Sequence, residues 1–113
     1  MQIEHIADEI KKIISFAMYQ ELRDPAFQDI TVTRVKVSKD LQFADIRFTS
    51  MDTINDIDVI EDKLNKASSA FRGILSKKIR LRRTPILRFH YDMDIVAEQK
   101  IEEMLRKIKQ QKS

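Results

Sequence analysis

The residues with the clearest chemical potential are the cations of one segment, residues 63–91. This 29-residue segment holds nine Lys and Arg side chains and no Asp or Glu, whereas the first 62 residues hold seven basic and thirteen acidic side chains. Uncompensated cations attract polyanions by Coulomb attraction and by releasing bound counterions. The segment therefore favours binding to phosphate groups. The alternative is a solvated helical face that only keeps the chain in solution.

We predict phosphate contacts from these cations and from the polar face of a preceding hairpin. Arg can bind a phosphate through two parallel hydrogen bonds, and Lys acts as a point charge. The segment contributes Lys66, Arg72, Lys77, Lys78, Arg80, Arg82, Arg83 and Arg88, and the hairpin adds Lys36 and Arg47. We expect no stacking on bases, because the aromatic residues of this region are expected in the core, namely Phe71, Phe89 and Tyr91.

Catalytic and metal chemistry find little support in the residue types. The chain has no Cys, and its single glycine, Gly73, leaves no phosphate-cradling glycine loop. His5 and His90 have no ligand spacing between them, so we expect no metal site. Asp92 and Asp94 could hold Mg²⁺ for a nuclease, but the pair also fits a helix cap, which we favour. We therefore expect no enzyme, no cofactor and no small-molecule substrate.

Length and composition fit one small domain. The chain has 113 residues, of which 42% are hydrophobic, so it can bury a core. No stretch approaches the roughly 20 apolar residues that cross a bilayer, and the N-terminus lacks a secretory pattern. We expect a cytoplasmic monomer with one domain over residues 1–109 and a frayed tail over residues 110–113.

The first half of the chain predicts a helix and a β-hairpin. Apolar residues recur at helical spacing over residues 2–20, and Pro25 disfavours a helix beyond Asp24. Residues 30–38 and 43–51 alternate as strands, and residues 38–41 form the turn. The phase of the first strand slips between Val32 and Val35, which indicates a bulge or the start of the strand.

The second half predicts a long helix, a third strand and a last helix. One helix is expected over residues 56–80 with Asn55 as its N-cap, and its Ser68 and Ser69 are interpreted as exposed serines without a role. A strand follows over residues 86–91. A helix over residues 95–109, capped by Asp92 or Asp94, carries an apolar face. The order is α-β-β-α-β-α, and the long crossover predicts an α+β fold with a mixed three-stranded sheet packed on helices.

Several segments together resemble the ribosome-binding factor A family. They are the stretch 64–72, the run 77–85 with its Arg80-Leu81-Arg82-Arg83, the strand 87–92, the pair Asp24-Pro25, the hairpin 35–44 and the opening helix. The resemblance covers roughly residues 3–105. It implies a type II KH-like domain that binds the small (30S) ribosomal subunit and its ribosomal RNA late in maturation. It also implies a part in processing the 5′ end of 16S rRNA and in cold adaptation.

One departure from the family pattern concerns the middle helix. The family has Ala-x-Gly at an interhelical kink, whereas this chain has Ala67, Ser68 and Ser69. A kink with positive φ would strain Ser69, so either the bend uses negative φ or the helix is straighter.

Two rival functions remain at this point. One is a protein-interaction module with a basic face, and the other is the Mg²⁺-dependent nuclease at Asp92 and Asp94.

Overall fold

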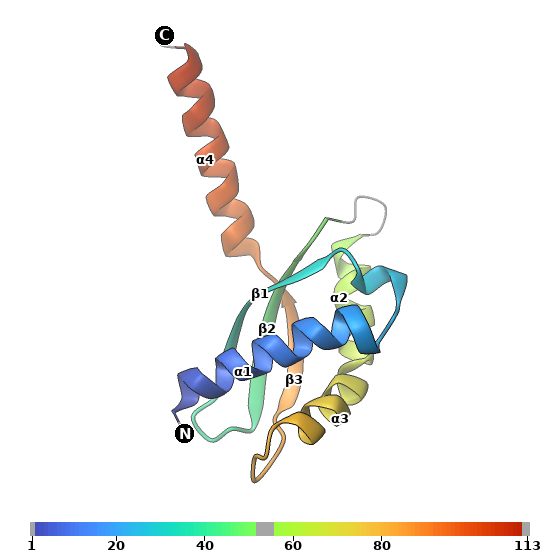
Figure 1. Ribbon diagram of the computed structural model, residues 1–113. Helices are drawn as coiled ribbons and strands as arrows, with labels where there is room; N and C mark the ends of the chain where they lie inside the picture. Colours follow the sequence, from blue (N-terminus) through green and yellow to red (C-terminus); the bar gives the residue numbers. More distant parts are fainter. Residues whose placement is uncertain (1, 52–55, 112–113) are drawn as a thin grey trace.

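The computed structural model describes residues 2–51 and 56–111, which form one sheet with helices on one of its faces (Figure 1). Helix α1 spans Ile3–Phe16 and continues as a π-helical turn, Ala17–Glu21, and a 3₁₀ turn, Pro25–Phe27, follows. Strands β1, Ile30–Val37, and β2, Phe43–Ser50, form the hairpin. The remaining elements are α2, Ile57–Lys66; α3, Ser68–Lys78; β3, Ile86–Tyr91; and α4, Met93–Gln111. The predicted α+β class is confirmed, with the middle helix divided in two.

The sheet has the order β1-β2-β3 and is mixed, as predicted. β1 pairs with β2 antiparallel, and β2 pairs with β3 parallel because α2 and α3 make the crossover. The register of the hairpin shifts between Val32 and Arg34, inside β1, so of the two alternatives for the phase slip the structure favours the bulge over the start of the strand. The hairpin turn is closed by Asp40, whose carboxylate accepts hydrogen bonds from the Ser38 hydroxyl and the Gln42 amide.

The core lies between the sheet and three helices, α1, α2 and α3 (Figure 1). Phe71 of α3 and Phe89 of β3 are fully buried, and their ring centroids lie 5.2 Å apart. Tyr91 is half-buried and meets Phe48 edge-on at 5.8 Å. The expectation that these aromatic residues belong to the core is confirmed. The opposite face of the sheet carries polar residues of β1, β2 and β3, and no helix of the described chain covers it.

The predicted continuous helix over residues 56–80 is wrong at its centre. Ala67, with φ −86° and ψ 2°, leaves the helical region and separates α2 from α3. The bend needs no glycine, because its φ is negative and Ser69 lies inside α3. The expected N-cap Asn55 lies outside the described residues. Asp56 caps α2 instead, since its carboxylate accepts a hydrogen bond from the Asp58 amide at 3.0 Å.

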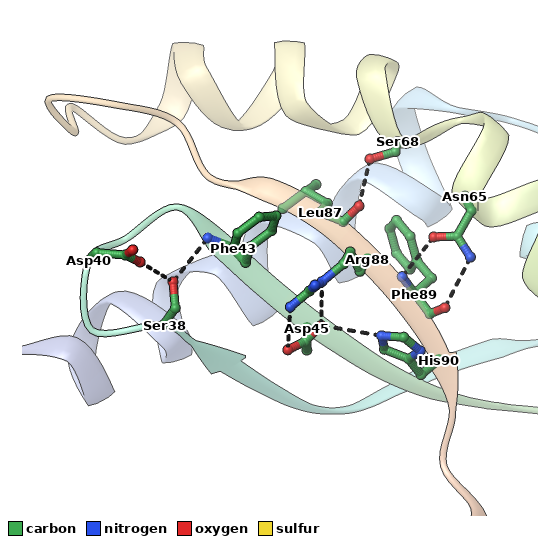
Figure 2. Close-up of polar contacts among 10 residues, drawn as sticks. All are labelled: Ser38, Asp40, Phe43, Asp45, Asn65, Ser68, Leu87, Arg88, Phe89 and His90. Carbon is green, nitrogen blue, oxygen red and sulfur yellow. Dashed lines mark hydrogen bonds and ion pairs between the residues drawn. The ribbon is translucent and has the colours of Figure 1, made fainter.

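Side chains at this helix break hold the edge of β3. The Ser68 hydroxyl donates to the Leu87 carbonyl at 2.8 Å, and the Asn65 amide both donates to the Phe89 carbonyl and accepts from the Phe89 N–H (Figure 2). The interpretation of Ser68 as a serine without a role is therefore wrong, while Ser69 is exposed. These bonds pair backbone groups of an edge strand that would otherwise be left open. They also fix the start of α3 relative to β3.

Helix α4 departs from its prediction in two respects. It begins at Met93 rather than Ile95 and continues to Gln111, into the segment expected to be frayed. None of its described residues is buried, so the apolar face predicted for this helix does not reach the core. It projects away from the sheet and from α1, α2 and α3 (Figure 1). The core is therefore complete without α4.

Candidate nucleic-acid interface

Five predicted cations lie on α3 and on the segment that joins it to β3. We call this set the α3–β3 cation surface and define it as Arg72, Lys77, Arg80, Arg82 and Arg83. All five side chains are exposed. Within the described residues, none of them forms an ion pair with an acidic side chain. No ion pair in the described part of the chain therefore withholds their charge from a ligand.

Local structure places these cations at one end of the molecule. Helix α3 ends at Lys78, and Ile79 turns to extended backbone with φ −121° and ψ 130°. Buried Pro85 then leads into β3, so residues 79–84 form a loop beyond the sheet (Figure 1). Arg72 of α3 contacts this loop directly, because its guanidinium donates two hydrogen bonds to the Thr84 carbonyl at 2.8 and 3.2 Å.

Three adjoining clefts run across this end of the chain. The first, about 340 Å³, is lined by Arg72 and Thr84 and by the small residues Ser69, Gly73 and Ser76. The second, about 230 Å³, shares Arg72 and Thr84 and adds Gln42, Arg83 and Ile86. The third, about 400 Å³, shares Arg83 and adds Asp40, Leu41 and Arg82. The shared lining residues show that the three clefts are neighbours, from α3 to the β1–β2 turn.

The lining of these clefts suits a sugar–phosphate backbone better than bases. It offers guanidinium groups, hydroxyls and a side-chain amide, and none of its residues is aromatic. The one acid at the rim is Asp40. Hydrogen bonds from the Ser38 hydroxyl and the Gln42 amide, with a smaller effect of Arg83, hold the pKa of Asp40 below its ordinary value. Asp40 is therefore anionic near neutral pH and partly offsets Arg83.

Four other predicted cations have acidic partners. Lys66 pairs with Asp62 at 2.9 Å, Lys78 with Glu21 at 3.7 Å, Arg47 with Asp94 at 3.4 Å and Arg88 with Asp45 at 2.9 Å. The free cations thus form a smaller set than the sequence predicts. Composition could not show this, because the partners of Lys78, Arg47 and Arg88 lie 43 or more residues away along the chain, on other elements.

The ten predicted cations do not share one surface. Arg88, Arg47 and Lys36 lie on the uncovered face of the sheet, which is the face opposite the helices. There Asp45 bonds Arg88 through two hydrogen bonds and also contacts His90 at 3.2 Å, while Arg88 lies 4.3 Å from the ring centroid of Phe43 (Figure 2). The parallel register sets this pairing, because Asp45 lies opposite Arg88.

The two carboxylates considered for a nuclease have structural partners. Asp92 is fully buried and accepts hydrogen bonds from the Thr33 hydroxyl at 2.6 Å, Arg34 at 3.2 Å and the Ile95 amide at 3.2 Å. Burial alone would raise the pKa of Asp92, but these bonds and the Arg34 charge lower it below its ordinary value. Asp92 therefore caps α4, as favoured from the sequence. Within the described residues no group of three or more His, Asp or Glu is placed to hold a metal ion.

The comparisons with known proteins agree on one family. A family model of ribosome-binding factor A matches residues 2–105. A ribosome-binding factor A from Petrotoga mobilis is 36% identical over 107 residues, which cover 93% of this chain and 89% of that protein. The chain belongs to the ribosome-binding factor A family.

Solved structures of ribosome-binding factor A have the same fold. The crystal structure of the Thermus thermophilus protein covers 80% of this chain and 97% of its own, with a TM-score of 0.71 and 23% identity. A homology model of ribosome binding factor A from the same organism, fitted into a cryo-electron microscopy map of a 30S complex, has a TM-score of 0.63 and 24% identity. It covers 77% of this chain and 91% of its own. None of the helices described in this chain is long and apolar enough to cross a membrane.

Reasoning from the sequence missed the uncharged residues of the interface. Ser69, Gly73 and Ser76 line a cleft with Arg72, and Thr84 joins them from the loop. Arg72, Gly73 and Ser76 follow Ser69 by three, four and seven residues, and this spacing places all four on one face of a helix. That spacing was present in the sequence. The contribution of Thr84 required the fold.

Proposed function

We propose that this chain binds ribosomal RNA of the small (30S) subunit late in its maturation, and that the α3–β3 cation surface makes the contact. Membership in the ribosome-binding factor A family supports the small subunit as partner. The observation that carries the choice of surface is that five exposed cations there lack acidic partners within the described residues. Lys66, Lys78, Arg47, Arg88 and Lys36 are proposed as secondary contacts.

The finer biological role is part of the same proposal. By holding the RNA near its immature end, the chain aids processing of the 5′ end of 16S rRNA in the cytoplasm. This help matters most in the cold, because misfolded RNA then leaves its misfolded states slowly. Cells that lack the chain should accumulate 16S rRNA with an unprocessed 5′ end, and more of it at low temperature. A normal 5′ end in such cells would contradict this role.

A pair of matched variants tests the surface. Replacing Arg80, Arg82 and Arg83 with Glu reverses three free cations and should abolish cosedimentation with purified small subunits. Replacing Lys66, Arg47 and Arg88 with Glu changes the net charge equally but reverses cations that already have acidic partners. The second variant should retain most of the binding. Circular dichroism and thermal melting show that both variants fold, and equal binding by both would refute the assigned surface.

The interaction module with a basic face is the rival function. An acidic protein would satisfy the same cations through carboxylates, so the chemistry of the surface alone does not separate the two ligands. RNase treatment of the isolated complex separates the two ligands, because an RNA contact is lost and a protein contact persists.

For the nuclease, incubation of labelled ribosomal RNA with the chain and Mg²⁺ should leave the RNA intact, since the Asp92 carboxylate already accepts hydrogen bonds from three protein donors.

A further inference from the structure

A small apolar cleft opens between the end of α1 and the end of α3. Its volume is about 150 Å³, and it is lined by Lys12, Ile13, Phe16, Glu21 and Lys78. Phe16 is 56% exposed although it is a large apolar residue, and Ile13 beside it is half-buried. Within the described residues the Phe16 ring stacks on no other aromatic ring. The cleft therefore presents an open aromatic surface that core packing does not explain.

A change of helix type brings the residues of this cleft together. Phe16 is the last residue of α1, and the chain continues as the π-helical turn Ala17–Glu21. The Leu22 N–H donates to the Ala17 carbonyl at 2.8 Å, which is the hydrogen bond between residues i and i+5 of a π turn. Residues five apart point to different sides of an α-helix, whereas this wider turn returns Glu21 to the cleft that Phe16 lines. Such turns are frequent at functional sites.

The rim of the cleft carries charges of both signs, and their arrangement indicates the occupant. Lys12 is exposed and forms no ion pair with any described residue, so it is free to meet a phosphate. Glu21 pairs with Lys78 at 3.7 Å, and its carboxylate can also accept hydrogen bonds from the N–H groups on the edge of a base. An acidic peptide would be repelled by Glu21 and a basic one by Lys12. A nucleotide, with its phosphate and its base edge apart, complements both.

We propose that this cleft holds one unpaired base of the ribosomal RNA, which stacks on Phe16 while its phosphate contacts Lys12. Unpaired bases that stack on aromatic side chains are the usual targets of single-stranded RNA recognition. The cleft is smaller than the roughly 300–1,000 Å³ of pockets for drug-sized ligands, and it suits a single flat ring system.

The cleft adjoins the α3–β3 cation surface along the chain. Lys77 belongs to that surface and Lys78 lines the cleft, so an RNA strand that follows the cations of α3 reaches Phe16. The inference therefore rests on the proposed function and adds a base contact to its phosphate contacts. The expectation of no base stacking considered only the aromatic residues of segment 63–91, and Phe16 lies outside that segment.

RNA with and without bases at its unpaired positions tests the proposal. The probe is a fluorescently labelled rRNA duplex with a short single-stranded extension, and its counterpart has abasic sites in the extension but keeps every phosphate. The wild type should bind the complete probe about tenfold more tightly, which is typical of one stacked base. Phe16→Ala should bind both probes alike. Tyr19→Ala removes an exposed aromatic ring that does not line the cleft and should retain the tenfold preference.

A fluorescent reporter tests the stacking itself. The chain has no Trp, so Phe16→Trp places a single indole in the cleft. A base stacked on this indole should quench its fluorescence, so the complete probe should quench it and the abasic probe should not. Tyr19→Trp should change little with either probe. Quenching of both reporters alike would contradict a base held at position 16.

The outcomes distinguish this proposal from the proposed function. Salt-dependent binding by the wild type with equal affinity for both probes would leave the phosphate contacts in place and refute the base site. If Phe16→Ala loses binding to small subunits but binds both probes as the wild type does, the cleft holds a protein side chain and the proposal is wrong. A wild type that binds neither probe would refute the base site and the proposed function together. Circular dichroism verifies that each variant is folded.

Discussion

The salt dependence of RNA binding should report how many free cations the interface contributes. Each phosphate neutralised on a duplex adds about −0.9 to the slope of log affinity against log salt. Five free cations, Arg72, Lys77, Arg80, Arg82 and Arg83, therefore predict a slope of about −4.5. Between 50 and 200 mM salt this slope amounts to a loss of about 500-fold in affinity.

Removing three of the five cations should change the slope by a calculable amount. A variant with Gln at positions 80, 82 and 83 retains two free cations, so its slope should fall to about −1.8 and its loss over the same salt range to about 12-fold. Fluorescence anisotropy with a labelled duplex from the small-subunit rRNA measures both slopes. The matched control carries Gln in place of Lys66, Arg47 and Arg88, which are ion-paired.

The comparison of the two variants is decisive for the argument from ion pairs. The control should keep a slope near that of the wild type, because its cations are already compensated by protein carboxylates. If the control variant loses as much slope as the loop variant, the ion pairs seen in the structure do not withhold charge from RNA. A flat salt dependence of the wild type would refute phosphate binding altogether.

Three further predictions concern the stability of the fold. Gly73→Ala should raise the free energy of unfolding by about 0.5–1 kcal/mol in chemical denaturation, because a Cβ at this exposed helical site meets no atom within 4 Å; a loss would show that the site is not an open helix surface. Ser68→Ala should cost about 1–2 kcal/mol, since the Leu87 carbonyl loses its donor, and Ser69→Ala should have almost no effect. Asp92→Asn should lower the free energy of unfolding at neutral pH. The folded pKa of Asp92 lies below its ordinary value of 3.8, so the extra stability of the wild type is present above pH 3.8 and is lost as pH falls through the lower folded pKa. Urea midpoints that differ equally at pH 3 and pH 7 would contradict this assignment.

Most of the fold was predictable because it follows from local periodicity. Alternation identified the strands β1 and β2, and the phase slip beyond Val32 lies where the register of the hairpin shifts. The crossover helix was sufficient to predict a parallel pair of strands. The break at Ala67 was not predictable from periodicity, because α2 and α3 carry nearly continuous apolar stripes. It is stabilised by long-range bonds from Ser68 and Asn65 to β3.

The candidate interface was only partly predictable, because charge counts do not reveal pairing. The acid-free segment drew attention to Arg72, Arg82 and Arg83, which line adjoining clefts. The same count included Arg88, which the parallel register places opposite Asp45 on the other face of the sheet. The sequence likewise predicted an apolar face on the last helix, and none of the described residues of α4 is buried. A pattern shows that a face is apolar but not what covers it.

Crosslinking tests the central claim most directly. Ultraviolet irradiation of the chain bound to purified small subunits joins RNA to the residues that touch it, and mass spectrometry of the digested complex identifies the modified peptides. We predict RNA adducts on peptides that contain residues 72–84. Adducts confined to the uncovered face of the sheet, or crosslinks to ribosomal proteins alone, would contradict the account.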